Sequence, residues 1–320
     1  MSDLLSLPRS PETAAASAMP TGRRGSALVA ALKRNLVGLA FVTPALVLFG
    51  LFVAYPIVET VHLSFIDWDG INSKLWIGLD NYRELFHDSV FTDSVKHTIY
   101  WALATVPAQM AVGLVLALAL DRDIRFRNAF RAIFFLPAVM SSVVVVFAWT
   151  WIYNPELGVL NWVLGWFGSG GQQWLNEPGH ALWASMVLSV WRYAGFSMIF
   201  YLAALQGIPT QLYEAARVDG ASWWQQTKRV TLPMLAPMTW LLSLLGLIGA
   251  LREFEVIWIL TRGGPADSTD LMSILVFKQA FENARPGYAA AIASLLLVGT
   301  AILSALILVG LRRSQKRVNG

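Results

Sequence analysis

The sequence from Tyr288 to Leu311, YAAAIASLLLVGTAILSALILVGL, contains no charged residue. A helix of about 20 apolar residues spans a hydrocarbon core about 30 Å thick, so this segment is long enough to cross a bilayer. Together with five earlier stretches it gives six apolar segments, near residues 36–58, 95–119, 132–153, 181–205, 236–260 and 288–311. The runs are continuous rather than alternating, which favours helices over the strands of a membrane barrel. The sequence therefore predicts an all-α polytopic membrane protein with six transmembrane helices.

The composition of the whole chain supports this prediction. Of its 320 residues, 56% are hydrophobic and only 14% are charged, and the mean hydropathy is +0.54. So few charges cannot cover the surface of a soluble protein of this size, and the 14 tryptophans suit interfacial belts. Soluble enzymes and nucleic-acid binders are therefore disfavoured. The net charge of +4 comes from short basic clusters between apolar runs, which we interpret as orientation signals rather than as a nucleic-acid site.

The basic residues predict the orientation of the chain. Loops 120–131 and 206–235 and the two ends of the chain carry sixteen Lys and Arg: Arg9, Arg23, Arg24, Lys33, Arg34, Arg122, Arg125, Arg127, Arg131, Arg217, Lys228, Arg229, Arg312, Arg313, Lys316 and Arg317. Loops 59–94, 154–180 and 261–287 carry five, namely Lys74, Arg83, Arg262, Lys278 and Arg285. The positive-inside rule then places both termini in the cytoplasm. We expect a disordered cytoplasmic tail at 1–35, a six-span domain at 36–312 and a basic cytoplasmic tail at 313–320.

Several kinds of chemistry are missing from the sequence. There is no G-x-x-x-x-G-K-[ST] phosphate loop, so the chain is not an ATPase by that route. The histidines have no metal-ligand spacing, and we interpret His62, His87, His97 and His180 as solvated or interfacial side chains. The chain has no cysteine, and we identify no catalytic residue and no metal site.

Ionisable residues are rare in the predicted spans, where burying a charge is costly and function is the usual reason to keep one. Arg192 lies within the fourth span, and Arg252, Glu253 and Glu255 lie in the outer half of the fifth. At helical spacing Arg252 and Glu255 can pair on one face, which leaves Glu253 on another. The pattern suits either a structural ion pair beside a wet crevice or contact with a polar substrate.

The most informative segment lies in the second inward loop, Glu214-Ala215-Ala216-Arg217-Val218-Asp219-Gly220, and continues to Val230-Thr231-Leu232-Pro233. It predicts a short helix, a break at Gly220, a second short helix, and a proline that opens the next span. Ala215 and Ala216 offer a small face suited to docking into a groove of another protein. An amphipathic connector lying on the lipid headgroups is the alternative.

This loop resembles the EAA motif, E-A-A-x3-G-x9-I-x-L-P, of the membrane subunits of binding-protein-dependent ABC importers, with Val230 where isoleucine is usual. Other segments are similar to the carbohydrate branch of that family, which contains the maltose and glycerol-3-phosphate permeases: residues 78–82, 134–137, 154–161, 205–209, 260–265 and 287–290. Arg262 stands where a third glycine is common. The chain lacks the extra N-terminal spans and large external insertion of the larger maltose subunit, so it resembles the shorter six-span members.

The resemblance implies a function and a set of partners. It implies the permease subunit of an importer of a carbohydrate, either a mono- or oligosaccharide or a polyol phosphate, in the cytoplasmic membrane of a prokaryote. A second related permease would complete a heterodimer, two cytoplasmic ATPase subunits would use the ATP, and an extracytoplasmic sugar-binding protein would deliver the cargo. The chain itself would be no enzyme and would need no cofactor. The positions that match the motif and would couple the chain to the ATPases are Glu214, Ala215, Ala216, Gly220, Leu232 and Pro233, and Asp219 beside Gly220 would join them.

Candidate substrate residues follow from the chemistry of sugars, which present apolar C–H faces and many hydroxyls and so suit aromatic platforms beside polar groups. Two neighbouring spans offer this mixture in Trp191, Arg192, Tyr193, Glu253, Phe254, Glu255 and Trp258. Lipid anchoring or packing is the alternative role for the aromatic members. We interpret Trp149, Trp151 and Tyr153 as an aromatic belt at the outer end of the third span.

Two other classes of function are weighed against an importer subunit. A stand-alone secondary carrier would transport without ATPase partners, and the missing relay of mid-membrane acids or histidines counts against it. A membrane enzyme acting on lipid-linked substrates would need a cluster of acids, histidines or metal ligands facing one leaflet, and the sequence shows none.

Overall fold

The computed structural model describes residues 39–169 and 171–319, with side chains as far as Arg312. The predicted tail at residues 1–35 lies outside the described residues. The chain divides into two compact units, residues 1–58 and 59–320, which we consider separately. The first unit contains most of the helical segment Leu39–Leu63, including the π-helical turn η1, Gly50–Ala54.

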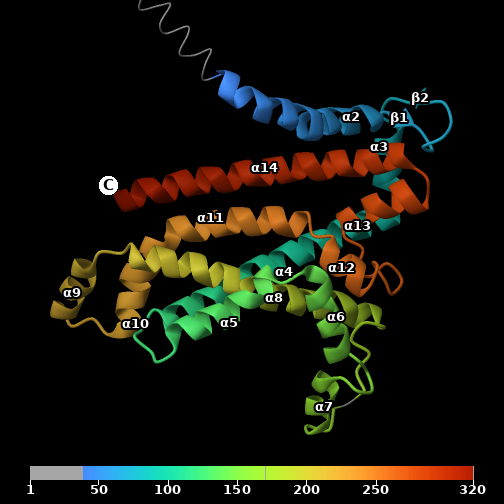
Figure 1. Cartoon of the computed structure of the whole chain (residues 1–320). Coiled ribbons are helices and arrows are strands. Elements are labelled where there is room, and N and C mark those ends of the chain that lie inside the picture. Colours follow the sequence, from blue (N-terminus) through green and yellow to red (C-terminus); the bar gives the residue numbers. More distant parts are fainter. Residues whose placement is uncertain (1–38, 170, 320) are drawn as a thin grey trace, which may run out of the picture. The chain divides into compact units, whose positions relative to one another are not determined.

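The second unit holds the rest of the described chain. Its elements are α3 (Asp80–His87), α4 (Ser89–Leu120), α5 (Arg127–Val139), α6 (Ser142–Ile152), α7 (Val159–Gly165), α8 (Pro178–Gln206), α9 (Thr210–Val218), α10 (Trp223–Gln226), η2 (Thr227–Thr231), α11 (Leu232–Leu251), α12 (Glu255–Leu260), α13 (Met272–Phe277), η3 (Lys278–Glu282) and α14 (Pro286–Asn319) (Figure 1). Helix α2 (Tyr55–Leu63) crosses the boundary between the units. The fold is thus predominantly helical, as predicted, with one addition. Strands β1 (Ile66–Asp67) and β2 (Leu75–Trp76) form a small antiparallel hairpin with Ile66 opposite Trp76.

The described residues contain five helices that are long and apolar enough to cross a membrane, at Leu39–Leu63, Ser89–Leu120, Pro178–Gln206, Trp223–Leu251 and Pro286–Arg312. A sixth span exists only if α5 and α6 count as one, and these two helices meet at an angle of 99°. The continuous third span predicted at 132–153 is therefore wrong in its geometry. The helix is interrupted because Met140 and Ser141 have non-helical backbone, three and four residues beyond Pro137, which itself lies within α5.

The predicted fifth span, 236–260, is also interrupted by a break in the structure. The helix begins thirteen residues earlier at Trp223 and ends at Leu251, and α12 starts only at Glu255. Hydropathy cannot show this break because apolar residues continue on both sides of it. Pro233 lies inside the continuous helical segment rather than opening it. The π-helical turn η2 ends two residues before this proline, whose ring nitrogen cannot donate to the carbonyl one turn earlier.

Helix α8 is the centre of the second unit and packs against α4, α5 and α11. It is the most buried of the candidate spans, with 56% of its apolar window inside the protein against 11% for α14. Small residues bring the helices together: a Cβ at Gly113 of α4 would lie 2.8 Å from the carbonyl oxygen of Ala194 on α8. The largest core cluster includes Trp101 of α4, Tyr201 of α8 and Leu235 of α11. Much of the remaining apolar surface is exposed, as a lipid-facing protein requires.

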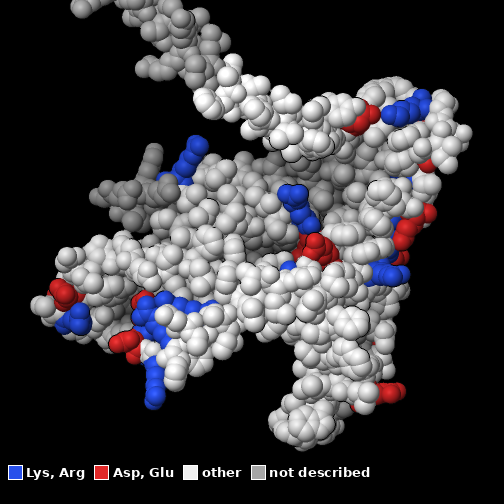
Figure 2. All heavy atoms as spheres, viewed as in Figure 1, with Lys and Arg blue, Asp and Glu red and all other residues white. Residues whose placement is uncertain are grey.

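Loops predicted to share a side of the membrane contact one another within the second unit. At one end Arg285 pairs with Glu84 at 2.7 Å, and the hydroxyl of Tyr288 donates to Asp88 at 2.6 Å. At the other end the guanidinium of Arg122 lies 5.0 Å from the ring centre of Trp223. The face of the second unit shown in Figure 2 is largely uncharged between these ends, apart from one group of charged side chains near its middle.

Candidate functional site

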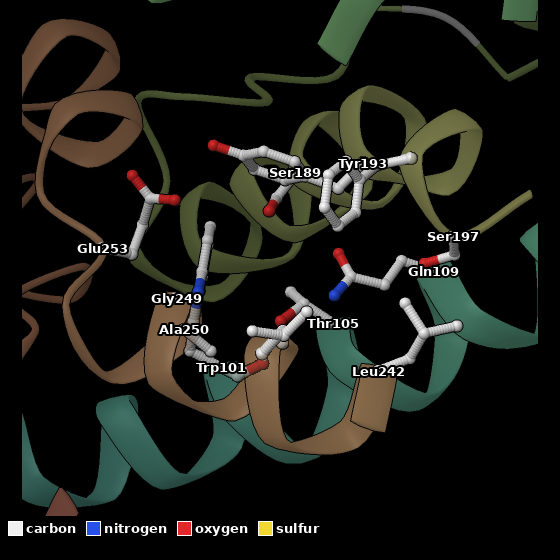
Figure 3. A pocket seen from close by; sticks show the side chains of 13 residues that line it. Trp101, Thr105, Gln109, Ser189, Tyr193, Ser197, Leu242, Gly249, Ala250 and Glu253 are labelled. Carbon is white, nitrogen blue, oxygen red and sulfur yellow. The ribbon is translucent and has the colours of Figure 1, made fainter. Parts of the chain in front are cut away.

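A cavity of about 240 Å³ lies between α4, α8 and α11, bounded at one side by the break that follows α11. Each helix contributes residues four positions apart, which share one helix face. They are Trp101, Thr105 and Gln109 from α4 and Ser189, Tyr193 and Ser197 from α8, as Figure 3 shows, while Leu242, Gly246 and Ala250 come from α11. Three helix faces therefore form most of the cavity wall.

The polar groups of this cavity are available to a ligand. In the described part of the chain, the side chains of Gln109, Ser189, Tyr193 and Ser197 make no hydrogen bond with the protein, whereas Thr105 donates to the carbonyl of Trp101 at 2.7 Å. Aromatic side chains stand beside these groups. The mixture is the one that carbohydrate binding needs.

Glu253 supplies the one carboxyl group that lines this cavity. It follows the end of α11 at Leu251, in the short non-helical segment before α12. The backbone N–H of Val256 donates to its Oε1 at 3.2 Å, and Ser273 donates to its backbone carbonyl oxygen. The hydrogen bonds to Val256 and Ser273 thus hold the carboxyl group and its backbone at the cavity wall.

A second cavity, of about 460 Å³, lies at the break between α5 and α6. Its lining includes Arg192, Phe254, Glu255 and Trp258. Arg192 is only 7% exposed, and its Nη2 donates to the carbonyl of Met140 at 3.4 Å. The rings of Phe254 and Trp258 stack with centroids 5.6 Å apart.

The structure thus places six of the seven predicted substrate residues at one of two cavities: Tyr193 and Glu253 at the first, and Arg192, Phe254, Glu255 and Trp258 at the second. Trp191 lines neither and packs against Trp149, with ring centroids 5.4 Å apart. The predicted pair between Arg252 and Glu255 is not present among the ion pairs of the described residues. The cause is the break in the helix, which removes the i, i+3 spacing, and Glu255 accepts a hydrogen bond from Ser142 instead.

The predicted aromatic belt is only partly correct. Trp151 is exposed, but Tyr153 is 2% exposed and its hydroxyl donates to the carbonyl of Ala184 at 2.7 Å. Trp149 packs against both Tyr153 and Trp191. Two of these three rings therefore join α6 to α8 rather than facing lipid.

The loop that carries the EAA-like motif has the predicted local structure of two helices around Gly220. Helix α9 ends at Val218, and Gly220 has φ +76°, a left-handed conformation that favours glycine. Ser222 then begins α10 with a capping box in which its hydroxyl and Gln225 each bond to the other's backbone. The hydroxyls of Tyr213 and Thr231 lie 3.1 Å apart and join α9 to the base of α11.

The surface of this loop is free in the described structure. Glu214, Ala215, Asp219 and Gly220 are exposed, Ala216 is half-buried, and Val218 is 88% exposed. The two further motif positions, Leu232 and Pro233, are also exposed, on the first turn of α11. The loop therefore presents small, apolar and acidic side chains together beyond the helical bundle.

The loop before α13 contains a buried charge cluster. The ammonium group of Lys278 lies 2.8 Å from both Asp267 Oδ1 and Asp270 Oδ2. The Asp270 side chain is 1% exposed, and burial raises its pKa to about 7 although Lys278 opposes the shift. Lys278 holds the pKa of the more exposed Asp267 below its usual value. The backbone carbonyl of Asp270 also bonds to His97 of α4 at 3.1 Å, so the cluster fastens this loop to the bundle.

Comparison with known proteins identifies the class. Residues 109–315 match the family described as binding-protein-dependent transport system inner membrane component, and the chain belongs to this family. It is 38% identical over 264 residues to a probable ABC transporter permease protein of Pyrococcus horikoshii, covering 81% of this chain and 89% of that one. It is 34% identical to the trehalose/maltose transport system permease protein MalF of Thermococcus litoralis (75% and 82% covered). It is 33% identical to the lactose transport system permease protein LacF of Rhizobium radiobacter (85% and 94% covered).

Solved structures agree with this class. A chain of a bacterial ABC transporter involved in the import of the acidic polysaccharide alginate superposes with a TM-score of 0.79 at 27% identity, covering 89% of this chain and 98% of that one. A chain of a bacterial alginate ABC transporter in complex with an alginate pentasaccharide-bound periplasmic protein superposes with a TM-score of 0.75 at 26% identity, covering 90% of this chain and 96% of that one. The family resemblance inferred from the motifs is confirmed. The chain is a multi-pass inner-membrane permease, a transport component rather than an enzyme.

The cavity residues Trp101, Thr105, Gln109, Ser189 and Ser197 were not among the sequence candidates. A signal for them exists in the sequence, because Thr105 and Gln109 of one span and Ser189 and Ser197 of another recur at multiples of four residues within apolar runs. That spacing places each set on a single helix face. Only the packing of α4 on α8 shows that the two faces meet.

Proposed function

We propose that this chain is the permease subunit of an ABC importer of carbohydrates. The observation that carries the proposal is the first cavity, where aromatic rings and unengaged hydroxyl and amide groups line the space between three helices of an importer-type fold. The names of the relatives for trehalose/maltose, lactose and multiple sugars support the same cargo class. The second cavity, with Arg192 and the stacked rings of Phe254 and Trp258, would extend the pathway.

We place the ATPase contact at loop 206–235. Glu214, Ala215, Ala216, Asp219 and Gly220 form α9 and its left-handed end, and Leu232 and Pro233 begin α11. Because the loop is fixed between α8 and α11, which both line the cavity, movement of a docked ATPase would be transmitted directly to the cavity walls. The exposed surface of the loop and its resemblance to the EAA motif support this role. The chain itself would need no cofactor, since ATP would be used by the partners.

The remaining assignments complete the assembly. Six spans, with α5 and α6 as one broken span, and both termini in the cytoplasm agree with the basic residues and with the contacts between loops of the same predicted side. The basic residues 313–319 would be the cytoplasmic end of α14, which continues to Asn319. Two ATPase subunits, a second related permease and an extracytoplasmic sugar-binding protein would join the chain in the cytoplasmic membrane of a prokaryote.

Uptake measurements test this proposal. Cells that lack the gene, and the same cells complemented with the wild-type chain, are offered labelled mono- and oligosaccharides and polyol phosphates. The proposal expects one compound whose uptake is lost in the deletion and restored by the chain, and only while the ATPase partners are present. Gene-dependent uptake that persists under an ion gradient without the ATPases would identify a secondary carrier instead.

A further inference from the structure

The first cavity has an unbalanced set of charged groups. Among its lining residues in the described part of the chain, Glu253 contributes a carboxyl group, and no lysine, arginine or histidine is present. Arg192, whose positive charge acts on Glu253, lines the second cavity instead, where it donates to the carbonyl of Met140. Arg252 is exposed and lines neither cavity.

The carboxyl group is positioned to accept hydrogen bonds from a ligand. Val256 N–H occupies one position at Oε1, and the described residues provide no hydrogen bond to Oε2. The view in Figure 3 places Glu253 on the opposite side of the cavity from Gln109 and Ser197. A ring bound between them would meet the carboxyl group at one edge and amide and hydroxyl groups at the other.

An anionic cargo would be disfavoured here for two reasons. It would lose its hydration shell without gaining a cation from the lining of this cavity, and it would lie beside a carboxyl group. A hydroxyl or ammonium group would instead form a charge-assisted hydrogen bond with the same oxygen.

We infer that the cargo of this permease is a sugar without negative charge, and that Glu253 determines this selectivity by accepting hydrogen bonds from its hydroxyl or ammonium groups. The inference rests on the proposed function and narrows it, because polyol phosphates and uronic acids are excluded. It separates this chain from the transporter of its structural relative, which is involved in the import of an acidic polysaccharide.

The test uses intact cells that contain the complete transporter and four labelled probes: a neutral disaccharide, an amino disaccharide, a uronic acid disaccharide and glycerol phosphate. We expect wild-type uptake of the neutral or the amino probe to exceed that of both anionic probes on the order of a hundredfold. The neutral and amino probes distinguish a hydroxyl from an ammonium as the donor to Glu253.

Two variants make the test specific to this residue. Glu253→Gln retains the size of the side chain but removes its charge, and uptake of the preferred probe should fall about tenfold at an equal amount of protein in the membrane. Glu156→Gln removes an exposed carboxyl group outside the cavity and should leave uptake unchanged.

Preferred uptake of an anionic probe by the wild type would overturn the inference, as would uptake by Glu253→Gln that stays within about twofold of wild type. If Glu253→Gln does not reach the membrane, the ranking of the four probes by the wild type still decides whether the cargo carries a negative charge. Gene-independent uptake of every sugar would instead overturn the proposed function, and the inference with it.

Discussion

Gly195 on α8 lies directly against the backbone carbonyl of Phe134 on α5, so closely that a Cβ at position 195 would overlap the carbonyl oxygen. Backbone atoms cannot move aside as the end of a side chain can. This contact holds the broken α5–α6 segment against the central helix, next to Arg192 and the second cavity. A glycine at this position therefore determines how closely the two helices approach.

Gly195→Ala should consequently destabilise the protein. Forcing a methyl group into a packed interface costs about 1–3 kcal/mol, and the rigid partner places this site at the upper end. The measurement is the melting temperature of the purified protein in detergent, expected to fall by several degrees. Gly299→Ala is the matched control, because Gly299 lies in α14 with nothing within 4 Å of an added Cβ. It should be neutral or stabilising by up to about 1 kcal/mol, and an equal loss in both variants would contradict the packing argument.

The buried Asp270 predicts a dependence of stability on pH. Its pKa is about 7 in the folded protein, above the ordinary 3.8, so the folded state binds the proton more tightly than the unfolded state. The stability that this proton contributes is fully present below about pH 4 and is lost as the pH rises through about 7, on the order of 4 kcal/mol at most. The melting temperature should therefore fall between about pH 4 and pH 7 and level off above that.

Two substitutions identify the group responsible. Asp270→Asn should flatten the fall in melting temperature over that pH range. Asp267→Asn should retain it, because Lys278 lowers the pKa of Asp267 and its titration lies on the acid side of the range. A steep fall that survives in Asp270→Asn would show that another group titrates.

The contact of Glu255 with Ser142, in place of Arg252, gives a further prediction. A double-mutant cycle of Ser142→Ala with Glu255→Ala should yield a coupling energy of about 1 kcal/mol in thermal unfolding, because the hydroxyl of Ser142 donates a hydrogen bond to the carboxyl group of Glu255. The cycle of Arg252→Ala with Glu255→Ala should give a coupling energy near zero. A larger coupling energy for Arg252 with Glu255 than for Ser142 with Glu255 would support the continuous helix that the sequence suggested.

The sequence alone indicated the spans and the site unequally well, for physical reasons. Long apolar runs such as Tyr288–Leu311 report the length of a helix reliably, and the turn at Gly220 is encoded locally by a residue that tolerates positive φ. The breaks at Met140 and at Arg252–Phe254 are not encoded locally. Apolar residues continue beyond each break, and tertiary packing compensates for the lost helical hydrogen bonds. The cavity depends on the close approach of α4 and α8 at Gly113, a long-range contact that no local pattern reveals.

Loop 206–235 is proposed above to couple ATP hydrolysis to movement of the cavity walls. Two glycines allow a matched test: Gly220 (φ +76°) in this loop and Gly168 (φ +74°) in the loop after α7. Neither has an atom within 4 Å of an added Cβ, and their N–H groups donate to Arg217 at 3.0 Å and to Gly165 at 3.1 Å respectively. Alanine therefore imposes the same backbone strain at both positions, about 1–2 kcal/mol, without a clash.

The most direct measurement is cargo-dependent ATP hydrolysis together with uptake, made on the complete transporter with each variant at an equal amount in the membrane. The account predicts that Gly220→Ala lowers both activities about tenfold, because the strain distorts the surface on which the ATPase docks, whereas Gly168→Ala leaves them within about twofold of wild type. Equal activity of the two variants would contradict the assignment of loop 206–235 as the coupling element.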